Sequence, residues 1–302
     1  MQAIAAFVLR GRNQAILSVI GFATLALVFT PFGLFSAASI GLVTLVHGPR
    51  QGLTITAIAS VFILVISSFT GQIILGTEYV VFYWLPVWFL AQLLSKNYSL
   101  TLVVIVSSVI GMIVAVVMAS LYVTYEVEWN KIIFDIFSTA FEQAKVDMAK
   151  DDKTVLLQNI GRWIVHFGAA YWVLSMCASL FIARWWQSLL YHPGGFGEEY
   201  RQLRLGIIFA VVGMIFIALA MVVKDGMLGH IFIGVASVIA LAFLFQGLAI
   251  AHYFAAVRKL KGIWLYMLYV MMLVLMPYEF ILIVLIGLSD NWVNYRARIK
   301  PL

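Results

Sequence analysis

A chain of 302 residues that is 64% hydrophobic and only 11% charged has too little polar surface to cover a soluble globule of its size. Its net charge of +6 does not indicate nucleic-acid binding, because no run of Lys and Arg is dense enough to follow a phosphate backbone. The charges lie instead in short gaps between about nine apolar stretches. This pattern predicts an all-α, polytopic transmembrane helix bundle, since a bilayer core of about 30 Å needs roughly 20 apolar helical residues.

The apolar stretches predict helices at 14–30, 32–47, 52–70, 79–95, 100–123, 163–183, 205–223, 229–256 and 263–288. The first of them follows Arg10 and Arg12, as in a secretory signal, but the later membrane segments favour a retained helix. Segment 32–47 is short for a full span, and 229–256 is long enough to tilt. We expect one integral membrane domain over residues 1–302.

The charges in the gaps predict the orientation of these helices. With a cytoplasmic N-terminus, the inner gaps are basic and the outer gaps are acidic through eight consecutive helices. The basic residues of the inner gaps are Arg10, Arg12, Arg50, Lys96, Arg184, Arg201, Arg204, Arg258, Lys259 and Lys261. We therefore expect a multi-pass protein of the bacterial cytoplasmic (inner) membrane, with the lipid bilayer as its first partner.

The last stretch, 263–288, breaks this rule, because a single crossing places Arg296, Arg298 and Lys300 outside. Pro277 lies near its middle, where proline removes a helical hydrogen bond. A segment that is broken at Pro277 and turns back returns the tail to the cytoplasm, and we favour it over one continuous crossing.

The outer interval 124–161 predicts an extracytoplasmic amphipathic insertion. Its apolar residues recur at helical spacing: Trp129, Ile133, Ile136, Phe137, Ala140, Phe141, Ala144 and Met148. Asp151 or Asp152 can cap a second short helix after it. The amphipathic helix either lies on the membrane surface or the bundle, or forms a lid or docking surface.

The cytoplasmic loop 184–204 combines interfacial tryptophans with turn residues. A phosphate-binding turn is disfavoured, because Glu198 and Glu199 repel an anion and no Walker lysine follows. We interpret the loop as a surface that couples to partner proteins, with candidate residues Arg184, Trp185, Trp186, Gly194, Gly195, Phe196 and Arg204.

Two groups of residues resemble a known family. They are Arg184-Trp185-Trp186-Gln187, Pro193-Gly194-Gly195-Phe196, Glu199 and Leu203-Arg204-Leu205 in the loop, and Gly287-Leu288-Ser289-Asp290-Asn291-Trp292-Val293-Asn294-Tyr295-Arg296 at the end. Together with the helix layout, they look like the YybS-like family of uncharacterised bacterial membrane proteins. That family is thought to be distantly related to S components of energy-coupling-factor transporters.

The resemblance implies a solute-binding fold that works with a membrane coupling protein and ATPases. The chain departs from S components in its first helix, which lacks their Ala-x-x-x-Ala coupling pattern; Ala115 and Ala119 stand in the fifth helix instead. This departure weakens the expectation of coupling to an energy module.

Polar and aromatic groups at membrane depth are the candidate ligand contacts, because burying them is costly. Glu279 and Tyr278 adjoin Pro277, and Tyr83 and Trp84 can stack on a flat ligand or anchor at the interface. His166 follows Arg162 by one turn, so both share a helix face. Each also has a structural interpretation, as a paired or hydrogen-bonded group within the bundle.

No motif for a metal, a cofactor or a nucleophile stands out, so we expect no enzyme and no cofactor. The lone Cys177 predicts a small buried hydrophobe.

Two functions remain. A solute-binding or transport subunit predicts a polar or aromatic cavity near Glu279 or Tyr83, whereas a membrane scaffold or regulatory subunit predicts a tight apolar core and exposed small-residue grooves such as Ala37-x-x-x-Gly41.

Overall fold

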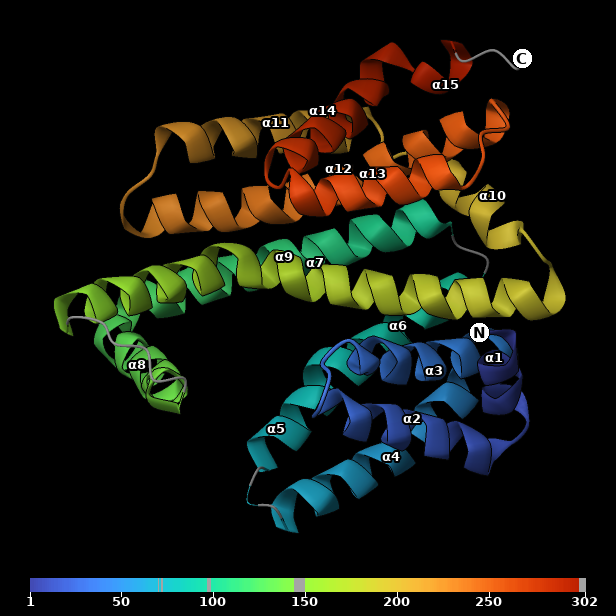
Figure 1. The fold of residues 1–302 in the computed structure, drawn as a ribbon, viewed down its shortest axis with the longest axis horizontal. Helices are drawn as coiled ribbons and strands as arrows, with labels where there is room; N and C mark the ends of the chain where they lie inside the picture. Colours follow the sequence, from blue (N-terminus) through green and yellow to red (C-terminus); the bar gives the residue numbers. More distant parts are fainter. Residues whose placement is uncertain (70, 72, 97–98, 144–149, 299–302) are drawn as a thin grey trace.

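The computed structural model describes residues 1–69, 71, 73–96, 99–143 and 150–298, and within these ranges the regular secondary structure is entirely helical (Figure 1). In chain order, the elements are α1 (Gln2–Leu9), α2 (Arg12–Ala26), α3 (Phe32–His47), α4 (Pro49–Phe69), α5 (Ile73–Glu78), the π-helix η1 (Tyr79–Trp84), α6 (Leu85–Ser95), α7 (Leu100–Thr124), α8 (Glu126–Gln143), α9 (Lys150–Tyr191), α10 (Gly195–Arg201), α11 (Ile207–Val222), α12 (Gly226–Val257), α13 (Ile263–Val274), α14 (Tyr278–Val293) and α15 (Tyr295–Arg298).

The helices begin and end at residues suited to those positions. The Ser99 hydroxyl caps α7 by accepting the backbone N–H of Leu102 at 3.2 Å. Gly48 ends α3 with φ +90°, and Gly206 precedes α11 with φ +88°. Side chains other than glycine rarely adopt these angles, so glycine permits the tight turns there.

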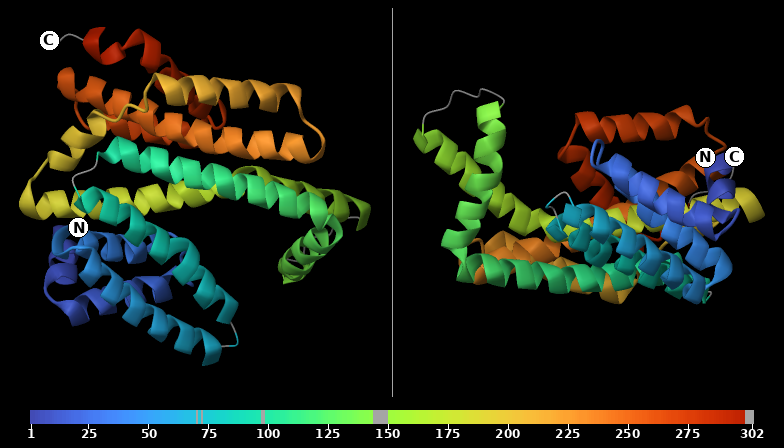
Figure 2. Two further views of the ribbon diagram at one scale, coloured as in Figure 1. Left: turned by 180° about the vertical axis from the view of Figure 1, so that it is seen from behind. Right: turned by 90° about the horizontal axis from the view of Figure 1, so that it is seen from below.

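α9 is the central helix of the bundle. It packs against α3 and α6 on one side and against α7 and α12 on the other. The N-terminal helices α1–α6 and the C-terminal helices α11–α15 thus lie on opposite sides of it (Figures 1 and 2). At roughly 1.5 Å per residue, its 42 residues are longer than a bilayer core is thick.

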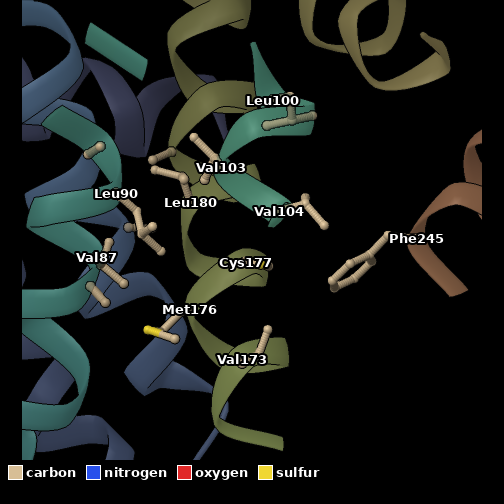
Figure 3. Close-up of a cluster of buried hydrophobic side chains, with 14 of the residues drawn as sticks. Val87, Leu90, Leu100, Val103, Val104, Val173, Met176, Cys177, Leu180 and Phe245 are labelled. Atoms are coloured by element: carbon tan, nitrogen blue, oxygen red, sulfur yellow. The ribbon is translucent and has the colours of Figure 1, made fainter. Parts of the chain in front are cut away.

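The core between α6, α7, α9 and α12 is apolar. Figure 3 shows Val87, Leu90, Leu100, Val103, Val104, Val173, Met176, Cys177, Leu180 and Phe245, all of them buried. Within it, Ser107 Oγ lies 3.2 Å from Cys177 Sγ. Cys177 is therefore a buried core residue, as the sequence predicts.

Five helical stretches are long and apolar enough to cross a membrane: Pro49–Phe69, Ile73–Ser95, Leu100–Thr124, Asp152–Tyr191 and Gly226–Val257. Shorter apolar helices accompany them, at Phe32–His47, Ile207–Val222 and Ile263–Val274. The described residues are thus helical throughout their regular secondary structure, and their length and composition fit a multi-pass membrane protein.

The expected count of nine spans is not reached by length, because several segments form helices shorter than the roughly 20 residues of a full crossing. α2 has 15 residues, α3 and α11 have 16 each, and α13 has 12. Other bounds also differ. The helix expected at 79–95 begins at Ile73, α1 was not expected, and the short helix expected after Asp151 is the first part of α9.

The last apolar stretch is broken, as Pro277 predicts. α13 ends at Val274 and α14 begins at Tyr278, and the turn between them lies about midway along the molecule in Figure 1. The chain then returns to the end where α10 lies, since Arg296 donates a 2.7 Å hydrogen bond to the Leu203 carbonyl. We call this end the α10 end and the opposite one, where α8 lies, the α8 end.

Two sequence interpretations concern surfaces. α8 forms over Glu126–Gln143 and projects from the bundle beside the first turns of α9 (Figure 2), while Ala144 and Met148 lie outside the described residues. The prediction that Ala37 and Gly41 form an exposed groove for a partner is wrong. Both residues are buried, and a Cβ at Gly41 would lie 3.0 Å from that of Ala183 in α9.

Candidate functional site

A polar cavity of about 320 Å³ opens at the α8 end, between the ends of α7, α9 and α12. Its lining is formed by Tyr122, Glu126, Gln158, Arg162, His166, Lys224, Asp225, Gly226 and His230. Most of these residues carry a charge or a hydrogen-bonding group. The cavity therefore suits a small polar molecule better than a hydrocarbon chain.

Helical spacing brings the α9 residues of the cavity together. Gln158, Arg162 and His166 follow one another at four-residue intervals, which places them on one face of the helix. Arg162 and His166 thus share a face, as their spacing predicts. Arg162 is held toward the helix by a 2.7 Å hydrogen bond from its Nη2 to Asn159 Oδ1.

Two histidines from different helices contact each other in the lining of the cavity. Nε2 of His166 lies 2.8 Å from Nδ1 of His230, and the edge of the Tyr122 ring packs against His230 with a centroid distance of 5.0 Å. One nitrogen must donate and the other accept, so at most one of the two rings is cationic. Ser237 Oγ also donates to the His166 backbone carbonyl at 2.8 Å, which fixes α12 against α9.

Charges of both signs line the mouth. Glu126 and Asp225 are acidic, whereas Arg162 and Lys224 are basic. Among the described residues, the ion pairs within 4 Å are Arg184–Glu199 and Asp290–Arg296, so none joins these four side chains to one another. Their charges are consequently available to a solute that carries both a cationic and an anionic group.

A second polar cluster, the Asp290 network, is buried near the α10 end. Asp290 is fully buried in α14, and its Oδ2 accepts hydrogen bonds from Arg296 Nη1 at 3.0 Å and Gln246 Nε2 at 3.2 Å. Its Oδ1 accepts the backbone N–H of Tyr295 at 2.9 Å. Burial lowers the pKa of the Arg296 guanidinium, and the Asp290 carboxylate partly offsets this.

The same network holds the segment that leads into α11. Gln246 Oε1 accepts the backbone N–H of Leu205 at 2.9 Å, and Asn291 Oδ1 accepts that of Gly206 at 3.1 Å. Arg204 donates to the carbonyls of Asp290 and Asn291 at 3.1 and 3.3 Å. The two sequence groups that carry the family resemblance, far apart in the chain, therefore meet here.

The aromatic candidates Tyr83 and Trp84 have packing partners within the bundle. Trp84 is fully buried and donates to Ser36 Oγ at 3.1 Å, so its ring is a packing element. Tyr83 is half-buried and stacks on Tyr79 with a centroid distance of 5.3 Å. Neither residue lines the cavity at the α8 end, and His166 is the predicted ligand residue that does.

Glu279 and Tyr278 also lie away from that cavity. Tyr278 is 79% exposed at the start of α14. Glu279 is half-buried in the first turn of α14, where the helix dipole stabilises a negative charge. Within the described residues it forms no ion pair. Neither residue belongs to the lining of the polar cavity.

The predicted coupling residues have different surroundings in the structure. Arg184 pairs with Glu199 at 2.8 Å, Trp186 is fully buried against the Phe35 ring, and Arg204 belongs to the Asp290 network, so all three stabilise the fold. Gly194 forms the turn before α10 with φ +92°, and Gly195 packs against His192.

Three of the predicted coupling residues face a cavity of about 550 Å³ at the α10 end. Trp185, Gly194 and Phe196 line it together with Tyr200, His252 and Tyr269. Tyr200 donates to the Phe245 carbonyl at 3.2 Å, and burial raises the pKa of its hydroxyl, which therefore remains a donor.

Within the described ranges, no group of three His, Cys, Asp or Glu residues could hold a metal ion. Comparisons of the chain with protein-family models, with curated protein sequences and with solved structures found no match.

Sequence reasoning missed most of the polar cavity. Lys224 and Asp225 fall in the gap between two apolar stretches, which was treated only as a topology signal, and His230 lies at the start of the second stretch. The signal that was available is that the gap is expected on the same side as Arg162. No local pattern shows which helices pack together, so the sequence does not reveal that His230 contacts His166.

Proposed function

We propose that this protein binds a small zwitterionic solute in the polar cavity at the α8 end, as a solute-binding or transport subunit. The observation that carries the proposal is that Glu126, Asp225, Arg162 and Lys224 line one cavity without pairing among themselves. All four side chains are exposed, so a solute that enters the cavity can reach their charges directly. The His166–His230 pair supplies a further polar part of the lining.

We place the α10 end and the N-terminus in the cytoplasm of a bacterium, with the cavity open to the outside. The gaps at the α10 end are rich in arginine and lysine, whereas α8 carries Glu126, Glu128 and Asp135, and this asymmetry supports the orientation. In this arrangement, short helices such as α3 and α11 complete about nine apolar segments at membrane depth.

We also propose that the chain is related to the YybS-like family and, more distantly, to transporter S components. Support comes from the Asp290 network, in which the two sequence groups of the resemblance contact one another. The coupling protein and ATPases implied by that relation would bind near loop 184–204. Trp185 and Tyr191 are the accessible aromatic residues there, at 36% and 63% exposed.

A membrane scaffold or regulatory subunit is the second candidate. α13 favours it, because none of its 12 residues is buried and its exposed side chains include Trp264, Tyr266 and Leu273. Such a helix offers an apolar face to a partner helix as readily as to lipid.

Thermal unfolding of the full-length protein in nanodiscs tests the proposed function. The probes are the standard amino acids and glycine betaine, together with native mass spectrometry of molecules that co-purify. We expect a zwitterion to raise the unfolding temperature, and Arg162→Gln to weaken its binding about tenfold or more through loss of a charge-assisted contact.

Two variants serve as controls. Lys131→Gln removes an exposed positive charge from α8 outside the cavity, and Glu279→Gln alters the acid at the midway turn; both should leave solute binding unchanged. If no zwitterion binds, or if Arg162→Gln and Lys131→Gln bind it equally, the proposed site is wrong and the scaffold function is preferred.

A further inference from the structure

A second cavity, of about 580 Å³, lies at the α10 end among α1, α2, α3 and α4. Its polar lining comprises Arg10, Arg12, His47, Gln51 and Thr54. Its floor is apolar, since Val8, Ala15 and Val43 are each at most 1% exposed. We call it the basic cavity.

The charged residues that line the basic cavity are all positive. The first Asp or Glu of the chain is Glu78, so α1–α4 contain no acidic residue at all. α9 also packs on α1, but its acids Asp151 and Asp152 stand at its opposite end. Among the described residues, neither Arg10 nor Arg12 forms an ion pair. Two guanidinium groups are therefore left to an external anion.

The backbone adds donors of the same character. Gly11 lines the basic cavity and precedes α2, whose first turn has no side-chain cap. The N-terminus of a 15-residue helix presents free N–H groups and a positive dipole end, which favour a phosphate. Arginine forks bind phosphate oxygens in a bidentate manner.

An apolar groove of about 410 Å³ lies along the same two helices, and its residues Ala3 and Phe7 stand at helical spacing from Arg10 of the basic cavity. It is lined by Ala3, Ile4, Phe7, Leu17, Ser18, Gly21, Phe22 and Leu25. Its one hydroxyl, Ser18 Oγ, donates to the Gln14 carbonyl at 2.9 Å and so is already satisfied. Its α2 residues run from Leu17 to Leu25, so the groove extends along that helix from its second turn to its end.

We propose that this corner of the molecule binds one anionic glycerophospholipid, with its phosphate in the basic cavity and an acyl chain in the α1–α2 groove. A lipid fits better than a free phosphate compound, because a soluble anion leaves the apolar groove empty. Basic pockets between membrane helices bind anionic headgroups by this combination of charge and apolar contact. The site is separate from the solute cavity, which lies at the other end.

Native mass spectrometry of the full-length protein tests the lipid site. Phosphatidylglycerol and phosphatidylcholine with identical acyl chains are offered in equal amounts. We expect phosphatidylglycerol to be retained over phosphatidylcholine by about tenfold or more, because each arginine near the headgroup adds a several-fold preference. Arg10→Gln combined with Arg12→Gln should bring this preference close to one.

Two further variants separate the headgroup from the chain. Lys261→Gln with Arg298→Gln removes two exposed charges at the same end, outside the basic cavity, and should retain the preference. Gly21→Leu fills the groove, where a Cβ meets open space, and should weaken both lipids about equally without disturbing the fold.

Three results would overturn the proposal. One is an unchanged lipid preference in the Arg10 and Arg12 variant, and another is an equal loss in the charge-matched control. The third is complete displacement of the lipid by glycerol phosphate together with unaltered binding in Gly21→Leu, which would indicate a soluble anion instead. If the double arginine variant does not fold, Gly21→Leu and the glycerol phosphate competition still decide between the outcomes.

Discussion

At the scale of single residues, Asp290 joins three parts of the chain that are distant in sequence. Its carboxylate accepts hydrogen bonds from Gln246 of α12, from the Arg296 guanidinium and from the backbone N–H of Tyr295. Its backbone carbonyl accepts a further hydrogen bond from Arg204. A buried charge is tolerated only when its lone pairs are satisfied. Asp290 meets that requirement with three donors, and it thereby fixes the returning tail.

Asp290→Asn should lower the free energy of unfolding by about 3 kcal/mol, because it leaves the Arg296 guanidinium buried without a counter-charge. The amide also cannot replace the carboxylate, since its NH₂ group must face one of the donors that contact Oδ1 or Oδ2. Denaturant unfolding in detergent measures the change. Glu199→Gln, which breaks the more exposed pair with Arg184, should cost about 1 kcal/mol or less, and equal losses in the two variants would contradict the prediction.

At the scale of elements, the crossing of α12 and α14 depends on two glycines. A Cβ at Gly247 would collide with the Ile283 carbonyl oxygen, and one at Gly287 with that of Phe243. In both cases the obstacle is backbone, which cannot move aside as a flexible side chain can. The close contact brings Asp290 within reach of Gln246, so helix packing and the buried network support each other.

Gly247→Ala should therefore destabilise the protein by about 1–3 kcal/mol through overpacking, despite the higher helix propensity of alanine. Gly21→Ala is the matched control, because its Cβ meets no atom within 4 Å, and it should be neutral or stabilise by up to about 1 kcal/mol. Thermal unfolding of both variants gives the comparison. A Gly247→Ala protein as stable as Gly21→Ala would show that the two helices separate at little cost.

Local patterns determined which elements could be predicted. The apolar runs predicted the helical class and α3 to the residue, and Pro277 predicted the break before α14, because both signals act within a few residues. α9 extends well beyond the expected 163–183, since charged residues such as Lys153 and Arg162 continue a helix that hydropathy alone ends. The π-helical turn η1 left no signal in the apolar pattern that we recognised.

At the scale of the whole molecule, the candidate site depends on helix pairing. His166 was a candidate because it is polar at membrane depth and follows Arg162 by one turn, but its partner His230 lies 64 residues later, in another helix. The hydrogen bond from the Trp84 N–H to Ser36 also depends on helix pairing, since the two residues lie 48 positions apart. Charge segregation, by contrast, needs no pairing, and it already separated the two ends at which the solute cavity and the basic cavity lie.

That separation predicts the membrane topology, which single cysteines can measure. Cys177 is the one cysteine of the chain and is fully buried, so a Cys177→Ala background has no thiol to react with a membrane-impermeant maleimide. In that background, Lys131→Cys on α8 should react in intact cells. Lys261→Cys and Arg298→Cys should both react only after the membrane is opened, because the break at Pro277 returns α15 to the α10 end. Reaction of Arg298→Cys from outside, with Lys261→Cys protected, would mean that the last apolar stretch crosses once, and it would separate Arg296 from Leu203 across the bilayer. The Asp290 network could not then exist, so this one comparison tests the orientation and the central contact of the fold together.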